Sequence, residues 1–191
     1  NTIIYAGEVT NSNSFASTTS LGVAQTSLGG GSGSGFTKVG FEVFTGHTLI
    51  GKDLTSITFA IDKYGTVSGT GYVSVYDSSG NQKGSSSSTY DLGTLTQWVS
   101  PVDYTFTWTT PITITNGDRI VLEGGSFNTS NQVDLYGTNT NAQEANINGV
   151  HFNSGGWISA TGSDVHFDAT YESTTGTALA DNTSTAKNYV F

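Results

Sequence analysis

Residues 54–62 read LTSITFAID, and from Ile57 to Ile61 this stretch places a large apolar side chain at every second position. Ile57, Phe59 and Ile61 would share one face, whereas the residues between them are small or polar. A period of two is the signature of a β-strand that is buried on one side. The same alternation predicts strands at residues 36–44, 71–77, 104–109 and 164–171.

Turn residues separate the predicted strands. Asn116-Gly117-Asp118 predicts a tight hairpin, and Pro111 is expected to end the strand 104–109, so that another begins at 112. Further strands are expected at 119–123, 132–136, 150–152 and 157–159. About ten short strands without a convincing helix predict an all-β, antiparallel sandwich, and the length suits a single domain over residues 1–191.

Charge and composition exclude several kinds of partner. Charged residues make up only 11% of the chain, the net charge is −9, and no two basic residues are adjacent. Nucleic acid requires clustered cations, so we expect no nucleic-acid partner. No apolar run approaches the roughly 20 residues that span a bilayer, so we expect no membrane insertion. The absence of cysteine excludes disulfides and thiolate metal sites.

Other features favour a location outside the cell. The chain contains no methionine, even at position 1, which leads us to expect that an initiator and a signal peptide have been removed. Asn128-Thr129-Ser130 and Asn182-Thr183-Ser184 are sequons for N-glycosylation. We therefore predict a secreted, cell-surface or virion-surface protein.

A pattern of motifs extends from about residue 36 to residue 172. It includes LTSITF at 54–59, GTGYVSVYDSSGN at 69–81, GDRIVL at 117–122 and DVHF at 164–167. In this pattern the chain resembles the jelly-roll domains found in surface proteins of bacteria, archaea and their viruses. The resemblance implies a jelly-roll sandwich similar to carbohydrate-binding modules, although many such domains are purely structural, so the fold leaves the function open.

No group of residues indicates catalysis. The sequence GSGSG at 31–35 lacks the strand and helix that flank a nucleophile elbow. His166 alternates outward between Asp164 and Asp168, where we expect a solvated surface. We therefore predict that the protein is not an enzyme and has no cofactor. The one exception comes from the resemblance, because jelly-roll modules often hold a structural Ca²⁺, for which Glu8, Asp164 and Asp168 could supply carboxylates. Plain surface charge is the alternative.

Aromatic residues near polar loops are candidates for sugar binding, because the C–H face of a sugar stacks on a ring. Trp157 follows a loop at 153–156, and Tyr136 ends a strand beside the Asn-rich loop 137–148. This pair is the predicted glycan site. The alternative is structural packing, since Trp98 and Trp157 lie where the resembled domains have framework aromatics and Trp108 alternates with core positions.

The two ends of the chain favour assembly. Residues 1–14 hold one short apolar run, Ile3, Ile4 and Tyr5, followed by a polar tether at 10–20. A C-terminal extension at 173–191 ends in Tyr189, Val190 and Phe191. An incomplete sandwich can accept an extended strand from a neighbour. We therefore predict a non-catalytic subunit of an extracellular filament or coat, built by strand complementation between copies of itself. The alternatives are that the N-terminal run is the first strand of its own sandwich, and that the protein is a carbohydrate-binding or adhesion module with glycans as partners.

Overall fold

The computed structural model describes residues 9–16, 23–28, 35–98, 101–126, 128–138, 145–161 and 163–175. These residues contain one short 3-10 helix, η1 (Leu92–Thr94), and are otherwise strands and their connections. The strands are β1 (Val9–Ala16), β2 (Val23–Leu28), β3 (Lys38–Val43), β4 (Asp53–Tyr64), β5 (Ser68–Tyr76), β6 (Gln82–Ser85), β7 (Tyr90–Asp91), β8 (Val102–Thr113), β9 (Arg119–Ser126), β10 (Gln132–Thr138), β11 (Ile147–Asn153), β12 (Gly156–Ala160), β13 (Asp164–Val165) and β14 (Phe167–Thr175). The predicted all-β class is confirmed.

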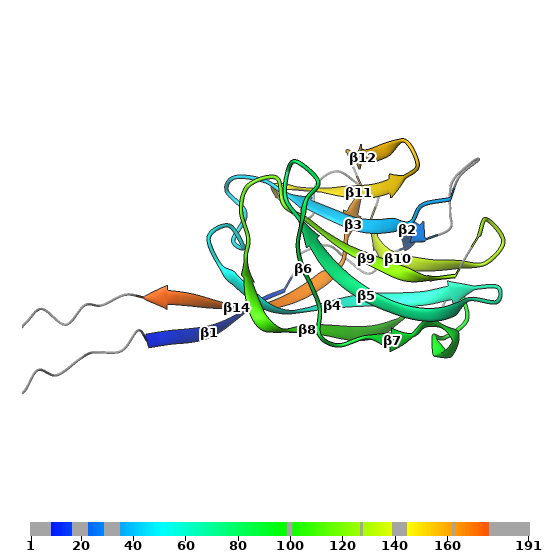
Figure 1. The fold of residues 1–191 in the computed structure, drawn as a ribbon, viewed down its shortest axis with the longest axis horizontal. Helices are drawn as coiled ribbons and strands as arrows, with labels where there is room; N and C mark the ends of the chain where they lie inside the picture. The colour runs from blue at the N-terminus through cyan, green and yellow to red at the C-terminus, as the bar shows by residue number, and fades with distance from the viewer. Residues whose placement is uncertain are drawn as a thin grey trace, which may run out of the picture.

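The strands form two antiparallel sheets of seven strands each, which face one another as a sandwich (Figure 1). The β4 sheet has the order β1, β14, β4, β10, β13, with β8 paired to β4 and β2 paired to β10. The β3 sheet has the order β12, β11, β3, β9, β5, β6, with β7 also paired to β5. The predicted antiparallel sandwich is therefore correct.

The chain alternates between the two layers. β3, β5, β9 and β11 belong to the β3 sheet, whereas β4, β8, β10 and β14 belong to the β4 sheet. Among the described strands, consecutive neighbours pair only in β5–β6 and β11–β12. Most pairing is therefore between strands that are distant in sequence. A jelly-roll connectivity in the strict sense remains a prediction.

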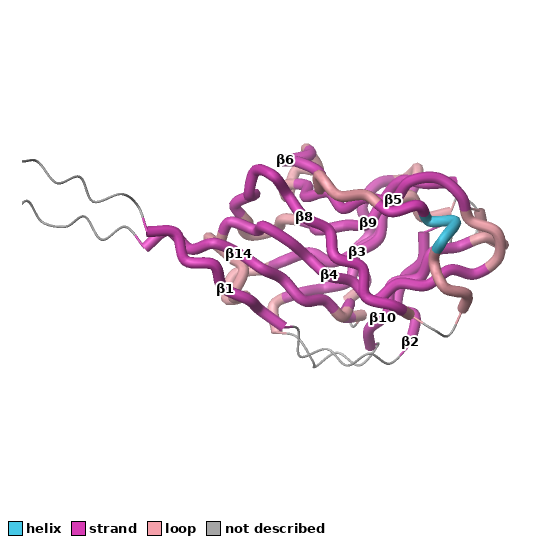
Figure 2. The backbone as a smooth tube through the Cα atoms, turned by 90° about the horizontal axis from the view of Figure 1, so that it is seen from below, coloured by secondary structure: helices cyan, strands magenta, loops and turns pink. Residues whose placement is uncertain are grey.

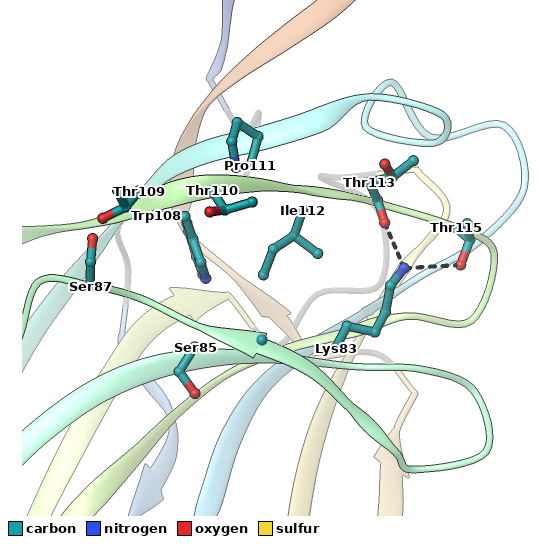
Figure 3. A pocket seen from close by; sticks show the side chains of 11 residues that line it. Lys83, Ser85, Ser87, Trp108, Thr109, Thr110, Pro111, Ile112, Thr113 and Thr115 are labelled. Carbon is teal, nitrogen blue, oxygen red and sulfur yellow. Dashed lines mark hydrogen bonds between the residues drawn. The ribbon is translucent and has the colours of Figure 1, made fainter.

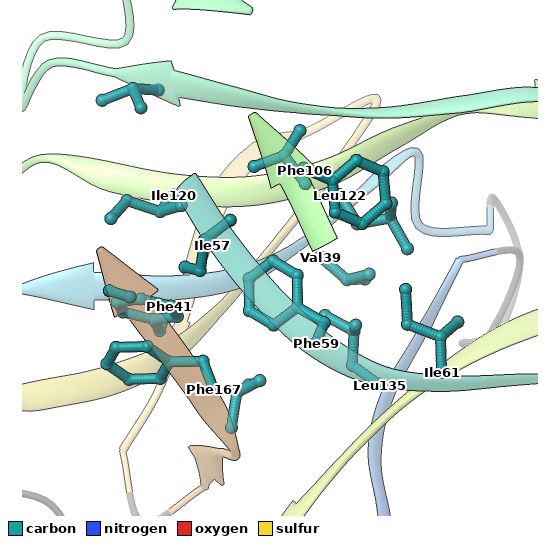
Figure 4. Packing of buried hydrophobic residues seen from close by; sticks show 14 of the residues in the cluster. Val39, Phe41, Ile57, Phe59, Ile61, Phe106, Ile120, Leu122, Leu135 and Phe167 are labelled. Atoms are coloured by element: carbon teal, nitrogen blue, oxygen red, sulfur yellow. The ribbon is translucent and has the colours of Figure 1, made fainter. Parts of the chain in front are cut away.

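A single apolar core fills the space between the sheets (Figure 4). Phe41 of β3 stacks on Phe167 of β14, with ring centroids 4.2 Å apart, and Phe59 of β4 meets Phe41 edge-on at 6.2 Å. All three rings have 0% exposure. Complete burial of such a side chain contributes about 1.5–3 kcal/mol. The alternating residues of β4 and β14 thus hold the two layers together.

Most predicted strands are present, but one boundary was wrong. Pro111 does not end a strand, because β8 continues to Thr113. The pairing with β4 instead shifts register between Leu54 and Ser56, so that residues 108–111 bulge out of the ladder. Proline lacks an N–H group and is tolerated in an edge strand or at a bulge. The short strands β1, β2, β6 and β7 were not predicted, because their sequences show little apolar alternation.

Candidate functional site

The two terminal strands of the described chain form a ribbon that extends beyond the sandwich. β1 pairs with β14 in one continuous register, from Val9 opposite Thr175 to Ala16 opposite Asp168. Figures 1 and 2 both show the far ends of β1 and β14 projecting side by side from one end of the body. The predicted tether is therefore wrong for residues 10–16, which form an edge strand. The predicted assembly residues, at 3–5 and 189–191, lie outside the described residues.

One side chain anchors β1 in the core. The Phe15 ring meets the His47 ring edge-on at 5.0 Å and lies 5.7 Å from the Phe167 ring. Ser12 and Ser14 are exposed, so at these two positions main-chain pairing holds the strand. His47 and Phe167 thus form the socket for Phe15. The signal that could have identified this anchor is a lone aromatic residue at the end of a polar, Asn- and Ser-rich stretch.

The predicted glycan site does not assemble. Tyr136 is 6% exposed, and its hydroxyl donates to Asp62 Oδ2 at 2.7 Å, so it presents no ring face to a ligand. Trp157 belongs to the other sheet and is half-buried against Tyr76 and Phe152, with ring centroids 5.2 and 4.9 Å away. Because the two residues lie in different layers, they cannot act together.

Trp157 instead covers a charged network on the outer face of the β3 sheet. The Arg119 guanidinium lies 5.1 Å from the Trp157 ring and donates to Glu42 Oε1 at 2.9 Å. Glu123 accepts hydrogen bonds from Lys38 and from the Tyr76 hydroxyl, the latter at 3.0 Å. Burial raises the pKa of Tyr76, and the Glu123 carboxylate adds to this against the opposing effect of Lys38. The compact pairing of these charges indicates a structural role.

An open groove of about 500 Å³ lies between β6 and β8, at the edge of the sandwich (Figure 3). Trp108 is 6% exposed, and its indole N–H has no hydrogen-bond partner among the described residues. In Figure 3 this ring and Ile112 point across the groove toward β6. Lys83 closes one end by donating to the Thr113 carbonyl at 2.5 Å and to Asp118 at 2.6 Å. The groove can therefore offer one buried donor to a ligand oxygen.

Two of the three residues expected to bind calcium lie in the described part of the chain. Asp164 is 3% exposed, whereas Asp168 is exposed. Four residues of extended chain separate them by about 13 Å. Glu8 lies outside the described residues. Within the described part of the chain, no group of three or more His, Cys, Asp or Glu side chains is arranged to hold a metal ion. The predicted calcium site of Glu8, Asp164 and Asp168 stays a prediction.

The outward strand face around His166 also differs from the prediction. Asp164 is buried and His166 is half-buried, so this face is not fully solvated. Of the two sequons, Asn128 is exposed in the turn between β9 and β10, and Asn182 lies outside the described residues. No helix among the described residues is long and apolar enough to cross a membrane.

The most exposed tryptophan of the described chain is one that was expected to be framework. Trp98 is 56% exposed and meets the ring of Tyr64, itself 47% exposed, at a centroid distance of 5.6 Å. The expectation that Trp98 packs inside the protein is therefore wrong. Its position between η1 and β8, outside any alternating stretch, is the sequence signal that could have indicated a surface position.

Comparison with known proteins gives no indication of the function. The chain matches no protein-family model, no curated protein and no solved structure. The resemblance to jelly-roll surface domains therefore remains a prediction, and function has to be inferred from the residues that the structure describes.

Proposed function

We propose that the protein is a non-catalytic structural subunit of an extracellular filament or coat, and that copies are joined by exchange of the N-terminal strand. In this assembly, β1 of one copy pairs with β14 of its neighbour. The observation that carries the proposal is the β1–β14 ribbon, in which an eight-residue terminal edge strand is held by main-chain pairing and one aromatic anchor.

Exchange of β1 preserves every contact of the closed subunit. The Phe15 socket and the register with β14 would be the same between copies as within one chain, so their energies cancel. The balance then depends mainly on the entropy of association. Swapping an identical element is a low-cost route to association. High local concentration at a surface favours the exchanged form.

The low charge of the chain supports dense packing of copies. Only 11% of the residues are charged. Three ion pairs neutralise part of that charge among the described residues: Lys38 with Glu123, Lys83 with Asp118, and Arg119 with Glu42. The low density of charge weakens the repulsion between copies, although a net charge of −9 remains. If each copy donates β1 to the next, the contact is head to tail and produces an open fibre.

An engineered disulfide tests the exchange directly, because the chain has no cysteine of its own. Ser12 lies opposite Glu172 in the register, and opposite residues in antiparallel strands have Cα atoms about 4.5–5.5 Å apart, within disulfide range. The control is Ser14→Cys with Glu172→Cys, a diagonal pair at about 7–8 Å.

After assembly and oxidation, Ser12→Cys with Glu172→Cys should give a ladder of covalently linked copies on a non-reducing gel, and the control pair should not. Electron microscopy of the same sample should show polymers. A disulfide found only within single chains, in protein that has polymerised, would contradict exchange of β1. Protein that stays monomeric at millimolar concentration would contradict assembly itself.

A further inference from the structure

Two exposed aromatic rings form a corner on the outward face of the β4 sheet. Trp98 and Tyr64 are 56% and 47% exposed, and their ring planes meet at 81°. Among the described residues, the other large exposed apolar side chains are Val102 and Ile158, and Ile158 belongs to the opposite sheet. The aromatic corner is therefore a small, isolated feature.

The backbone fixes this corner in place. Lys63 and Gln97 form a parallel bridge, and the Lys63 N–H donates to the Thr96 carbonyl at 2.9 Å. Parallel neighbours point to the same side of a sheet, so the next pair, Tyr64 and Trp98, share the outward face. The Lys63 ammonium also donates to the Gly93 carbonyl in η1, so β4 holds the segment 93–98 at both Gly93 and Thr96. Both rings are thus positioned before any ligand binds.

One uncharged polar side chain borders the rings. Gln132 lies opposite Tyr64 in the register with β10, on the side away from Trp98. Gln97 shares the opposite face with its bridge partner Lys63. The row from Trp98 through Tyr64 to Gln132 runs from the segment at 97–98 across β4 to β10, a width of about 10 Å. Lys63 is 8% exposed and directed to Gly93. Within the described part of the chain, the corner therefore offers ring faces and a carboxamide without an accessible cation.

These features decide between classes of ligand. A site for single-stranded nucleic acid combines aromatic stacking with a positively charged groove, and this corner lacks such a groove. A stable protein interface buries about 800 Å² on each partner, which two rings cannot supply. A saccharide needs only a ring face for its C–H groups and nearby polar side chains for its hydroxyls. We propose that Tyr64 and Trp98 form a binding platform for a neutral saccharide, with Gln132 as a hydrogen-bonding partner.

The platform is independent of the proposed assembly. The β4–β5 connection and η1 lie at one end of the molecule, and the β1–β14 ribbon projects from the other (Figures 1 and 2). Copies joined through the ribbon would leave the platform accessible. A polymer would then carry one platform per copy, and multivalency would raise its avidity for a glycan-coated surface.

Affinity electrophoresis tests this proposal with β-glucan, α-mannan and galactan as neutral probes and alginate as an anionic one. The full chain should be retarded by at least one neutral polysaccharide. Trp98→Ala and Tyr64→Ala should each weaken the retardation by about tenfold, since each removes one stacking surface. Ile158→Ala, which removes an apolar residue of 41% exposure in the other sheet, is the matched control and should have no effect.

Three outcomes would overturn the proposal. The first is no retardation by any neutral probe, and the second is retardation by alginate alone. The third is unchanged retardation in both aromatic variants. Unchanged circular dichroism will show that the variants are folded, and polymerisation, followed separately, should be the same in all of them. If Trp98→Ala instead abolishes concentration-dependent association without affecting any saccharide, the corner is a contact between copies.

Discussion

Replacing Phe15 by alanine should loosen β1 without unfolding the sandwich. The ring is half-buried against His47 and Phe167. Truncation of a fully buried phenylalanine costs about 3–5 kcal/mol, so roughly half of this, about 2 kcal/mol, is expected at Phe15. Phe167, which has 0% exposure and stacks on Phe41, should cost the full amount.

The assay combines thermal unfolding with hydrogen exchange. Phe15→Ala should lower the melting temperature by about 4–8 °C for a chain of this size, and the amides of β1 and β14 should lose protection before those of β4. Ser14→Ala is the matched control, because Ser14 is exposed on the same strand and its loss should change stability by less than about 0.5 kcal/mol.

The same change should leave the concentration needed for assembly nearly unchanged, because the Phe15 socket is the same within one chain and between copies, so its loss weakens both forms equally. If Phe15→Ala leaves the protection of β1 unchanged, then Phe15 is not the anchor, and the reasoning from its socket fails.

Two further predictions concern the body of the sandwich. Gly40→Ala should prevent folding or cost more than about 3 kcal/mol of stability, because a Cβ atom there would lie 2.0 Å from the Ile120 carbonyl oxygen. In the control Gly51→Ala, the new Cβ meets no atom within 4 Å, and the change should cost only about 1 kcal/mol for the positive φ of this residue. Equal urea midpoints for the two variants would contradict this. Burial and Glu123 raise the pKa of Tyr76 above its ordinary value of 10.0. The folded state therefore holds this proton more tightly, and the stabilisation is complete below pH 10.0 and is lost as the pH rises through the folded pKa. Tyr76→Phe should flatten the fall in stability above about pH 10, and a fall as steep as in the wild type would show that other groups cause it.

Local alternation was sufficient to identify the central strands. Val165, Phe167, Ala169 and Tyr171 were expected to face inward. The first three are buried at 3% exposure or less, and Tyr171 is half-buried against the core. Ile57, Phe59 and Ile61 of β4 are buried in the same way. The reason is that side chains of an extended strand alternate between its two faces. In a strand with one buried face, the alternation of apolar residues therefore shows which side chains point into the core.

Exposure of the aromatic residues depended on parts of the chain that alternation does not describe. Trp98 was expected inside and is exposed, whereas Tyr136 was expected at the surface and is buried with its hydroxyl on Asp62. A ring is covered or exposed according to which loops and strands pass over it. That information lies in contacts between distant segments, so a local pattern cannot supply it.

The sequence by itself determined the all-β class, the positions of the central strands and the residues that line the core, because these follow from a period of two along each strand. Only the tertiary structure decided that the polar residues of β1 form a strand, since their partner, β14, lies at the opposite end of the described chain. It also decided that Tyr64 and Trp98 meet, through a bridge between Lys63 and Gln97. Main-chain hydrogen bonds do not depend on side-chain type, and so such pairings leave little trace in the sequence.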